Sequence, residues 1–276
     1  MLLRLLPLLL ASTALLPAQS DWDEPFPPHR IADNLYYVGS KGLSSYLVTS
    51  SDGHILINSS FDRTVPHIRA SIEKLGYKFS DVKILLGSHA HADHMEGNAL
   101  VKKLTGAQVY VMEGDEGAIA NGGEGQYLYN ARWAPCKVDR VLRDGDKVTL
   151  GDATLIARRT PGHTPGCTTW TMEVRDGGKI YLAVIVGSPN VNSGYQLVNN
   201  ASYPEIAKDF AETFRVLKSL KCDIFLGAHG SYYGLDAKYP RLKPGAANPF
   251  VDPDGYRAYI TEREQHYLKV LKEQGQ

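Results

Sequence analysis

Residues 85–98, which read LLGSHAHADHMEGN, place three histidines and an aspartate within six positions directly after an apolar run. In extended backbone, side chains two positions apart point to the same side, so His89 and His91 can face one point. Asp93 and His94, at the turn into the next predicted helix, can address a second point. Four ionisable side chains behind a buried strand are costly to desolvate without a cation. The stretch therefore predicts a pair of metals at the end of a strand.

Two further histidines occur in a similar setting, each in a glycine-containing turn after an apolar strand: His163 in RRTPGHTPGC and His229 in FLGAHGSYYG. Because strand ends converge in space, we expect these turns to meet the histidine cluster. The predicted ligand sets are His89, His91 and His163 for one metal, and Asp93, His94 and His229 for the other. Imidazole with one carboxylate and no thiolate favours zinc, although iron and manganese accept the same ligands.

The remaining histidines lack ionisable neighbours of this kind. We expect structural roles for His29, His54, His67 and His266, with a supporting role behind the metal ligands as the alternative for His54.

Strand and helix patterns alternate along the chain. Residues 31–58 predict an antiparallel meander of three strands; later strands are predicted at 82–88, 107–112, 147–161, 167–174, 179–187 and 222–229, and helices at 65–77, 96–107, 203–221 and 252–274. The glycine-rich segment 113–136 is too irregular for an ordinary connection, which is typical of a functional or mobile loop. Both halves run from strands to a helix with no linker between them. We therefore predict an α/β protein with one domain at 21–276 and helices on both sides of layered sheets.

The charge balance and the N-terminus constrain partners and location. Thirty Lys plus Arg offset thirty Asp plus Glu, so no overall field would draw the chain to nucleic acid or anionic lipid, and a small molecule is the expected partner. We also expect the chain to be a monomer. Residues 1–20 combine an early arginine, a short apolar run broken by prolines, and small residues before Asp21. This pattern predicts a signal peptide at 1–20, a periplasmic mature protein and no membrane segment in it, with a membrane anchor as the alternative.

Only three cysteines are present, Cys136, Cys167 and Cys222. At most one intramolecular disulfide can form from them. None has a second cysteine three or four positions away, so a structural zinc cluster made of thiolates is excluded.

The motifs HAHADH, PGHTPG and GAH resemble those of the metallo-β-lactamase superfamily, and the resemblance covers nearly all of the chain after residue 20. It implies a four-layer αβ/βα sandwich with a di-metal site at the sheet edge. That superfamily includes glyoxalase II, lactonases, sulfatases and ribonucleases besides β-lactamases, so these motifs alone leave the substrate open.

Further details resemble class B subclass 3 of the metallo-β-lactamases. In glyoxalase II and the lactonases an aspartate bridges the metals at a position where this chain has Ser188, after Gly187. Subclass 1 uses a cysteine ligand and replaces the histidine at His94, and subclass 2 has asparagine at the position of His89. Many relatives pair a cysteine at the position of Cys222 with one near the C-terminus, but Tyr256 stands there, so that disulfide is not expected.

The resemblance implies zinc-dependent hydrolysis of the β-lactam amide bond in penicillins, cephalosporins and carbapenems, which would give antibiotic resistance. A hydroxide shared by two zinc ions would attack the carbonyl, and Asp93 would orient it as the catalytic residue. The residues expected to contact substrate are Ser188, Asn190 and Asn192 on one wall, and Tyr127, Tyr129 and Trp133 on another. Loop packing is the alternative role for these aromatic residues.

Two other functions remain open at this point. One is a related di-zinc hydrolase that acts on a lactone or thioester, and the other is a non-catalytic periplasmic zinc-binding protein. Three protein ligands per zinc leave coordination positions open, which favours hydrolysis over storage.

Overall fold

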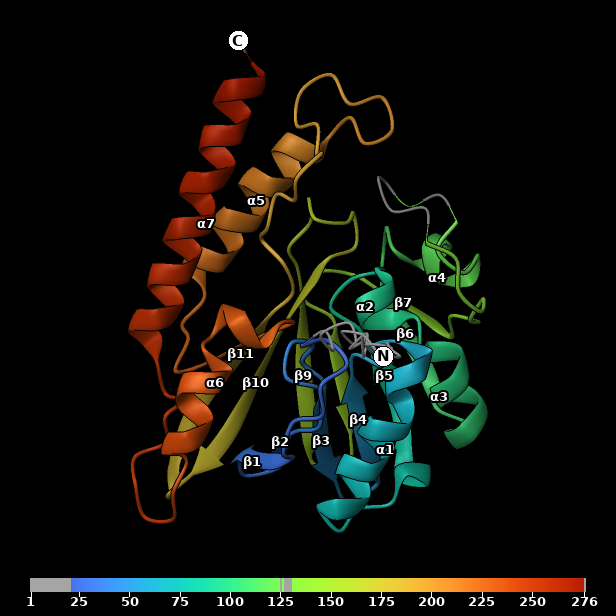
Figure 1. Cartoon of the computed structure of the whole chain (residues 1–276), viewed down its shortest axis with the longest axis vertical. Helices are drawn as coiled ribbons and strands as arrows, with labels where there is room; N and C mark the ends of the chain where they lie inside the picture. Colours follow the sequence, from blue (N-terminus) through green and yellow to red (C-terminus); the bar gives the residue numbers. More distant parts are fainter. Residues whose placement is uncertain (1–20, 125, 127–130, 276) are drawn as a thin grey trace, which may run out of the picture.

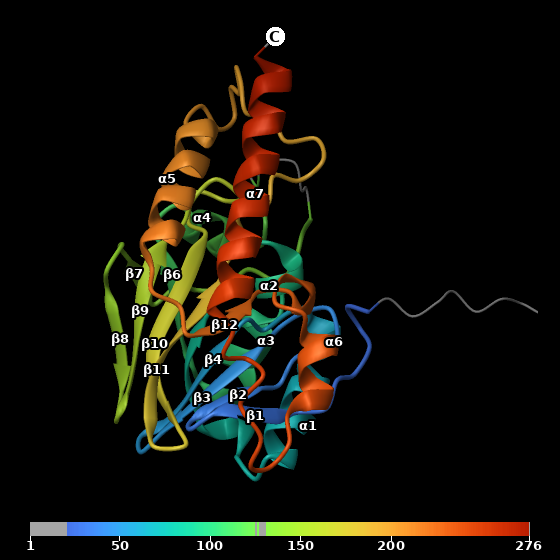
Figure 2. The ribbon, with the colours of Figure 1, turned by 90° about the vertical axis from the view of Figure 1, so that its left-hand side faces the viewer.

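The computed structural model describes residues 21–124, 126 and 131–275. The predicted signal peptide and two of the predicted substrate contacts, Tyr127 and Tyr129, therefore lie outside the described residues. Two β-sheets occupy the middle of the molecule, and helices cover the outer face of each (Figures 1 and 2).

The first sheet has its strands in chain order, because each strand pairs with the next one along the sequence. Its members are β1 (His29–Ala32), β2 (Leu35–Tyr37), β3 (Tyr46–Ser50), β4 (Gly53–Ile57), β5 (Val82–Leu86), β6 (Gln108–Met112) and β7 (Arg140–Leu142). Strands β1 to β4 form an antiparallel meander, and β4 to β7 are parallel. Such parallel strands need crossovers, which here carry helices.

The second sheet has the order β12-β11-β10-β9-β8. Its strands are β8 (Lys147–Leu150), β9 (Ala153–Arg159), β10 (Thr168–Asp176), β11 (Lys179–Val186) and β12 (Ile224–Gly227). Strands β8 to β11 are antiparallel, and β12 lies parallel to β11 after a helical crossover.

The helices form the two outer layers. They are α1 (Val65–Lys74), α2 (Ala92–Met95), α3 (Asn98–Thr105), α4 (Glu116–Ala120), α5 (Ile206–Ser219), α6 (Leu235–Lys238) and α7 (Pro253–Gln274), with 3₁₀ turns η1 (Asp62–Thr64), η2 (Phe79–Asp81), η3 (Gly230–Tyr232) and η4 (Tyr239–Arg241). Helices α1 and α3 cover the first sheet, while α5 and α7 cover the second (Figure 2). The four-layer αβ/βα sandwich is thus confirmed.

Two apolar cores hold these layers together. The larger lies between the sheets and extends under α5 and α7, with Trp170 and Phe210 almost fully buried in it. The smaller joins the outer face of the first sheet to α1 and α3 through residues such as Ile72 and Val101. Alternate residues of a strand point to opposite faces, so β5 serves both cores, with Ile84 in the first and Leu85 in the second.

The secondary structure departs from the sequence prediction in two places. The meander has four strands, because a tight turn at Asp33, with φ of 36°, divides its first run into β1 and β2. The glycine-rich segment contains the short helix α4, and β7 follows it; neither was predicted. Only Ile119 of α4 is buried, so α4 has almost no apolar periodicity to detect.

All three cysteines are free, buried thiols. Within the described part of the chain, no helix has the length and apolar character needed to cross a membrane.

Candidate metal centre

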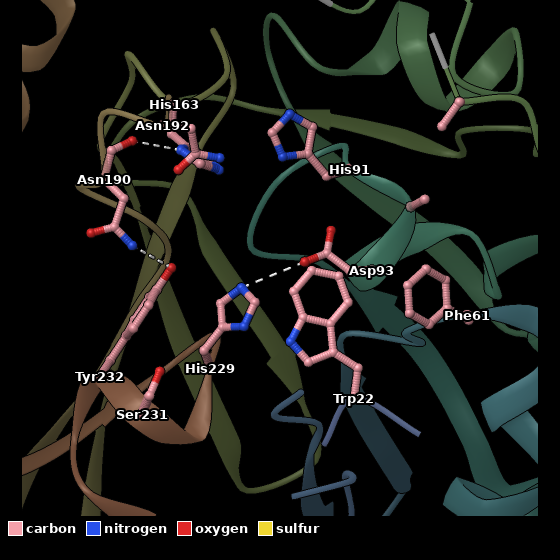
Figure 3. Close-up of a pocket in the computed structure, with 12 residues that line it drawn as sticks. Trp22, Phe61, His91, Asp93, His163, Asn190, Asn192, His229, Ser231 and Tyr232 are labelled. Carbon is pink, nitrogen blue, oxygen red and sulfur yellow. Dashed lines mark hydrogen bonds and ion pairs between the residues drawn. The ribbon is translucent and has the colours of Figure 1, made fainter. Parts of the chain in front are cut away.

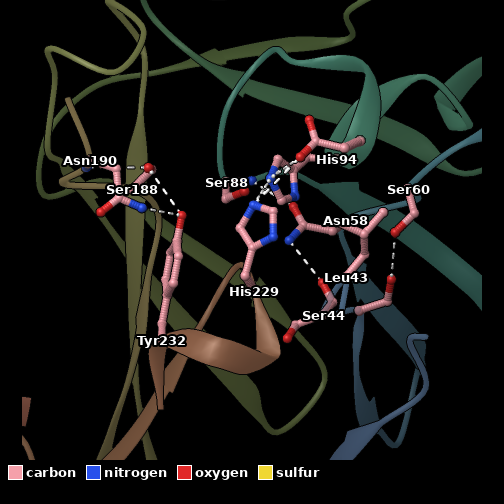
Figure 4. Close-up of polar contacts among 12 residues, drawn as sticks. Leu43, Ser44, Asn58, Ser60, Ser88, His94, Ser188, Asn190, His229 and Tyr232 are labelled. Carbon is pink, nitrogen blue, oxygen red and sulfur yellow. Dashed lines mark hydrogen bonds and ion pairs between the residues drawn. The ribbon is translucent and has the colours of Figure 1, made fainter. Parts of the chain in front are cut away.

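The predicted ligands lie on loops that follow strand ends at one edge of the sandwich. Strand β5 ends at Leu86, and the chain then turns through His89 and His91 into α2, which carries Asp93 and His94. The turn is fixed by the His91 amide, which donates to the carbonyl of His89 at 2.9 Å. His163 lies in the loop between β9 and β10, and His229 directly follows β12. The structure brings all six together. Figures 3 and 4 show how His91, His163, Asp93, His94 and His229 converge from these loops.

The first group consists of His89, His91 and His163, which are all buried. One ring nitrogen from each lies within 4.8 Å of the others. Nδ1 of His163 contacts the carbonyl oxygen of Asn190 at 2.8 Å, so it acts as the donor. That bond fixes the tautomer and leaves Nε2 with a lone pair for a metal, as is usual for histidine ligands.

The second group has the spacing of a tetrahedral coordination shell. Nε2 of His94 lies 3.2 Å from Nε2 of His229 and 3.2 Å from Oδ2 of Asp93. The His229 Nε2 to Asp93 Oδ2 distance is 3.5 Å. Ligands about 2.0–2.1 Å from one tetrahedral zinc are roughly 3.3 Å apart, which matches all three distances. One ring nitrogen of His89 also lies within 4.8 Å of a carboxylate oxygen of Asp93 and of a ring nitrogen of His94, so the two groups are adjacent.

The protonation states suit metal binding. Burial lowers the pKa of His89 and His91 well below the usual range, that of His163 to about 4 and that of His229 to about 3, so these imidazoles are neutral at pH 7. Burial opposes ionisation of Asp93, but the adjacent His94 and His229 outweigh it and lower the pKa of this carboxyl group. Nδ1 atoms of His89 and His94 have no hydrogen-bond partner among the described atoms. Neutral imidazoles with one carboxylate fit zinc.

A buried carboxylate behind the ligands, Asp115, joins the two histidine loops. Its Oδ2 accepts hydrogen bonds from the amide of Ala90 at 2.8 Å and from Oγ1 of Thr164 at 2.7 Å. Its Oδ1 accepts from the amide of Gly166 at 2.8 Å. A Cβ atom at Gly166 would lie 2.7 Å from Asp115, so only glycine allows this approach. Asp115 thus fixes the loops that carry His89, His91 and His163.

Sequence reasoning missed Asp115, because it lies in the acidic, glycine-rich stretch EGDEG, where a carboxylate normally faces solvent. Its position directly after β6 was the one available signal. Asn58 was missed in the same way: its Oδ1 accepts from the amide of Ser88 at 2.8 Å, and its Nδ2 donates to the carbonyl of Ser44 at 3.0 Å (Figure 4).

A cavity of about 460 Å³ opens over the ligands. One wall is polar and contains Asn190, Asn192, Ser231 and Tyr232, while Trp22 and Phe61 form an apolar wall on the other side of the histidines (Figure 3). Among the described lining residues there is no lysine or arginine, and Asp93 is the one carboxylate.

Two of the predicted substrate contacts line the cavity, and a third lies behind its wall. Asn190 and Asn192 line the cavity, whereas Ser188 is 1% exposed and lies behind Tyr232. Oγ of Ser188 is 3.3 Å from the Tyr232 hydroxyl, which accepts a hydrogen bond from Nδ2 of Asn190 at 2.8 Å (Figure 4). Ser188 therefore supports two lining residues rather than facing the cavity.

Trp133 does not line the cavity. Its ring packs against the backbone at Gly123, where a Cβ atom would lie 2.4 Å from the indole, and it joins the smaller apolar core. This geometry favours loop packing as the role of Trp133. Among the described residues of this segment, Ala131 lines the cavity.

The other histidines have structural contacts away from the metal centre. His29 stacks on Phe250, with ring centroids 5.7 Å apart and planes at 11°. His54 contacts Tyr77 edge to face. The rings of His67 and His266 each contact a backbone carbonyl, that of Gly39 and that of Val191 respectively.

Comparison with known proteins agrees with this geometry. The family model described as Metallo-beta-lactamase superfamily matches residues 41–176. Among solved structures, the FEZ-1 metallo-β-lactamase from Legionella gormanii is 50% identical, with a TM-score of 0.90 over 92% of this chain and 98% of that one. BJP-1, a subclass B3 metallo-β-lactamase of Bradyrhizobium japonicum, is 39% identical, with a TM-score of 0.88 over 93% and 97%. The class B3 di-zinc metallo-β-lactamase LRA-12 from an Alaskan soil metagenome is 34% identical, with a TM-score of 0.86 over 92% and 98%.

Curated relatives match over a shorter region. A probable metallo-hydrolase of Burkholderia pseudomallei is 31% identical over 97 residues, which are 33% of this chain and 31% of that protein. A hydroxyacylglutathione hydrolase of Rhodospirillum rubrum is 29% identical over 99 residues, 36% of this chain and 31% of that protein. The chain thus spans about a third of the length of these curated relatives.

Proposed function

The chain belongs to the metallo-β-lactamase superfamily and, within it, to subclass B3, and from this premise we propose that it hydrolyses the amide bond of β-lactam rings in penicillins, cephalosporins and carbapenems. The observation that carries the proposal is the position of two adjoining ligand triads at the base of an open cavity. A site that only stored metal would not need such access.

We propose two zinc ions per chain as the cofactor. His89, His91 and His163 would hold one, and Asp93, His94 and His229 the other. When bound, zinc supplies a Lewis acid for the amide carbonyl and lowers the pKa of water toward about 7. The spacing of the second triad, which matches a tetrahedral shell, and the neutral state of His229 support this assignment.

Asp93 has two tasks in the proposed reaction. Its Oδ2 lies against His94 and His229, and the carboxylate also borders the cavity, where it can accept a hydrogen bond from the attacking water. Its lowered pKa keeps it ionised at neutral pH. It thereby orients the water toward a carbonyl held over the ligands.

We propose that uncharged side chains orient the substrate. β-Lactam antibiotics carry a carboxylate, and the described lining offers it the hydroxyl and amide groups of Ser231, Asn190, Asn192 and Tyr232 in place of a cation. Ser188 supports this wall from behind. Its Oγ contacts the Tyr232 hydroxyl and lies 3.5 Å from the backbone nitrogen of Asn190. Nδ1 of His163 donates to the Asn190 carbonyl, so the polar wall is linked directly to a metal ligand.

A di-zinc thioester or lactone hydrolase is the second candidate, favoured by the match to a hydroxyacylglutathione hydrolase. Against it, the position expected for a metal-bridging aspartate is Ser188, whose hydroxyl is buried against Tyr232. Parallel assays with a β-lactam, a lactone and a glutathione thioester separate the two. The proposal requires kcat/KM to be highest for the β-lactam by at least about tenfold.

The biological setting is proposed from the sequence. Residues 1–20 are a signal peptide, the mature domain begins at Asp21, and it acts as a periplasmic monomer that gives antibiotic resistance. N-terminal sequencing of protein from the periplasmic fraction tests the cleavage site, and light scattering tests the oligomeric state. Minimal inhibitory concentrations with and without the gene test resistance.

A further inference from the structure

The loop between β11 and α5, residues 187–205, lines part of the cavity and also holds a predicted metal ligand. Asn190 and Asn192 lie on the polar wall. The backbone carbonyl of Asn190 accepts the hydrogen bond from Nδ1 of His163 at 2.8 Å. The hydroxyl of Tyr195 donates to the backbone carbonyl of His163 at 2.7 Å, and the centroids of their rings lie 5.7 Å apart. The loop therefore fixes both the ring and the backbone of His163.

This loop depends on neighbouring elements for its path, because residues 187–205 form neither helix nor strand. Within the loop, the amide of Tyr195 donates to the carbonyl of Asn192 at 3.1 Å. The residue that supports His163 is thus tied to a residue that lines the cavity. Tyr195 is 2% exposed, so its side chain has little freedom to move. A shift at Tyr195 would reach both the metal ligand and the polar wall.

Gln274, the last residue of α7, binds the loop at two points. Its Oε1 accepts a hydrogen bond from the amide of Leu197 at 2.6 Å, and its Nε2 donates to the carbonyl of Tyr195 at 2.7 Å. One side-chain amide thus satisfies a backbone donor and a backbone acceptor on either side of Gln196. Gln274 is not among the residues that line the cavity, so its effect on the site passes through this loop.

Helix α7 gives this contact a rigid base. Tyr267, two helical turns before Gln274, is 4% exposed and stacks on Phe210 and Phe214 of α5, with ring centroids 5.7 and 5.5 Å apart. Its hydroxyl donates to the carbonyl of Ala207 at 2.8 Å. The loop lies beside this half of α7 (Figures 1 and 2). The side chain of Gln274 therefore projects toward the loop from a helix that is packed firmly against α5.

We propose that Gln274 is a positioning residue for the metal centre and for the polar wall of the cavity. By holding Tyr195, it fixes the backbone of His163 from behind and sets the positions of Asn190 and Asn192. A histidine ligand whose supporting contacts are loosened binds metal less tightly, and a loosened wall orients substrate less well. The part of the inference that concerns zinc stands without the proposed function, whereas the part that concerns substrate rests on it.

Zinc affinity gives the first test. Asp93→Ala removes a ligand of the second triad, so in that background chelator competition reports the first triad, to which His163 belongs. Adding Gln274→Met, which keeps the side-chain length but removes both hydrogen bonds, should lower the zinc affinity about fivefold. Tyr195→Phe should lower it about tenfold. The variant with both changes should lose no more than Tyr195→Phe alone, because the two residues act through one chain of contacts.

The kinetics of the zinc-saturated protein, with Asp93 intact, give the second test. For Gln274→Met we expect KM for benzylpenicillin to rise about fivefold at similar kcat, because the wall that binds substrate is loosened. Gln274→Glu keeps the acceptor for the Leu197 amide and should give an intermediate KM. Glu273→Gln is the matched control. It alters an exposed carboxylate on the same turn, 3.9 Å from Nζ of Lys269, and should change neither KM nor zinc affinity.

The outcomes separate a positioning role from a structural one. If Gln274→Met lowers the melting temperature but leaves zinc affinity and KM unchanged, the positioning role is overturned. Additive losses of zinc affinity in the variant with both changes would also overturn it, since Gln274 and Tyr195 would then act independently. If the wild type hydrolyses no β-lactam, the proposed function fails, and the zinc measurements still decide the role of Gln274.

Discussion

The Nε2 atoms of His94 and His229 lie 3.2 Å apart, although 135 positions separate the two residues in the sequence. One follows β5 of the first sheet and the other follows β12 of the second, so their meeting depends on the packing of the two sheets. Two ring nitrogens whose lone pairs face each other at this distance repel each other unless a proton or a metal cation lies between them. The Asp93 carboxylate, 3.2 Å from one of these nitrogens and 3.5 Å from the other, completes a set of three ligand atoms that suits a metal cation.

Replacement of Asp93 tests the second ligand triad. For Asp93→Ala we expect kcat to fall by more than about a hundredfold, since this change removes both a ligand and the group that orients water. Bound zinc, measured by mass spectrometry of metals after dialysis, should fall by one equivalent. Asp254→Ala removes an exposed carboxylate at the start of α7 and is the matched control. Full activity of Asp93→Ala would remove Asp93 from the mechanism.

Replacement of Asp115 tests whether the ligand loops are held from behind. Asp115→Ala leaves the amides of Ala90 and Gly166 buried without an acceptor, so we expect the free energy of unfolding to fall by about 3 kcal/mol. The affinity for zinc, measured by chelator competition, should fall about tenfold. Asp115→Asn keeps an acceptor and should lose less. An alanine variant that is destabilised but binds zinc normally would limit Asp115 to a structural role.

Stability should depend on pH through His29. Burial lowers the pKa of His29 to about 4, although its hydrogen bond to the Pro27 carbonyl opposes this. In the unfolded chain this histidine binds a proton near pH 6.5. The contribution of neutral His29 to the free energy of unfolding is therefore complete above pH 6.5 and is lost as the pH falls toward 4. Between pH 7 and pH 5 the loss is about 2 kcal/mol. In urea unfolding of the metal-free protein, His29→Phe should lose correspondingly less stability over this interval; equal losses would contradict the assignment.

Replacement of Ser188 tests the support of the polar wall. Ser188→Ala removes the hydroxyl that contacts Tyr232 and the Asn190 amide, and we expect KM for benzylpenicillin to rise about fivefold with little change in kcat, as for loss of one hydrogen bond. Tyr232→Phe should give a similar rise. Unchanged Michaelis constants for carboxylate-bearing β-lactams would remove Ser188 from substrate binding.

The sequence predicted the fold and the six candidate metal ligands from local signals, and the assignment of these residues as metal ligands stays a prediction. The motif HAHADH after a buried strand predicts four candidate ligands together. His163 and His229 each lie in a glycine-containing turn after an apolar strand, as that motif does. The structure confirms the four-layer arrangement and brings these six side chains together.

The walls of the cavity could not be predicted in the same way. Trp22 reaches the cavity because its indole packs on Gly42 and its neighbour Asp23 pairs with Arg63, and such tertiary contacts produce no periodic pattern in the sequence. Asp115 looked like a solvent-exposed loop residue, because its three donors come from two other loops. Trp133 was predicted either to contact substrate or to pack the glycine-rich loop, and its contact with Gly123 favours the packing role.

Zinc-dependent turnover is the most direct test of the central claim. Steady-state hydrolysis of benzylpenicillin, a cephalosporin and a carbapenem would be measured on metal-free protein while zinc is titrated in. We predict no turnover without metal, recovery of activity up to two equivalents of zinc, loss on addition of a chelator and no effect of clavulanate. Turnover that persists in the metal-free protein, or zinc-loaded protein that hydrolyses none of the three, would contradict the account.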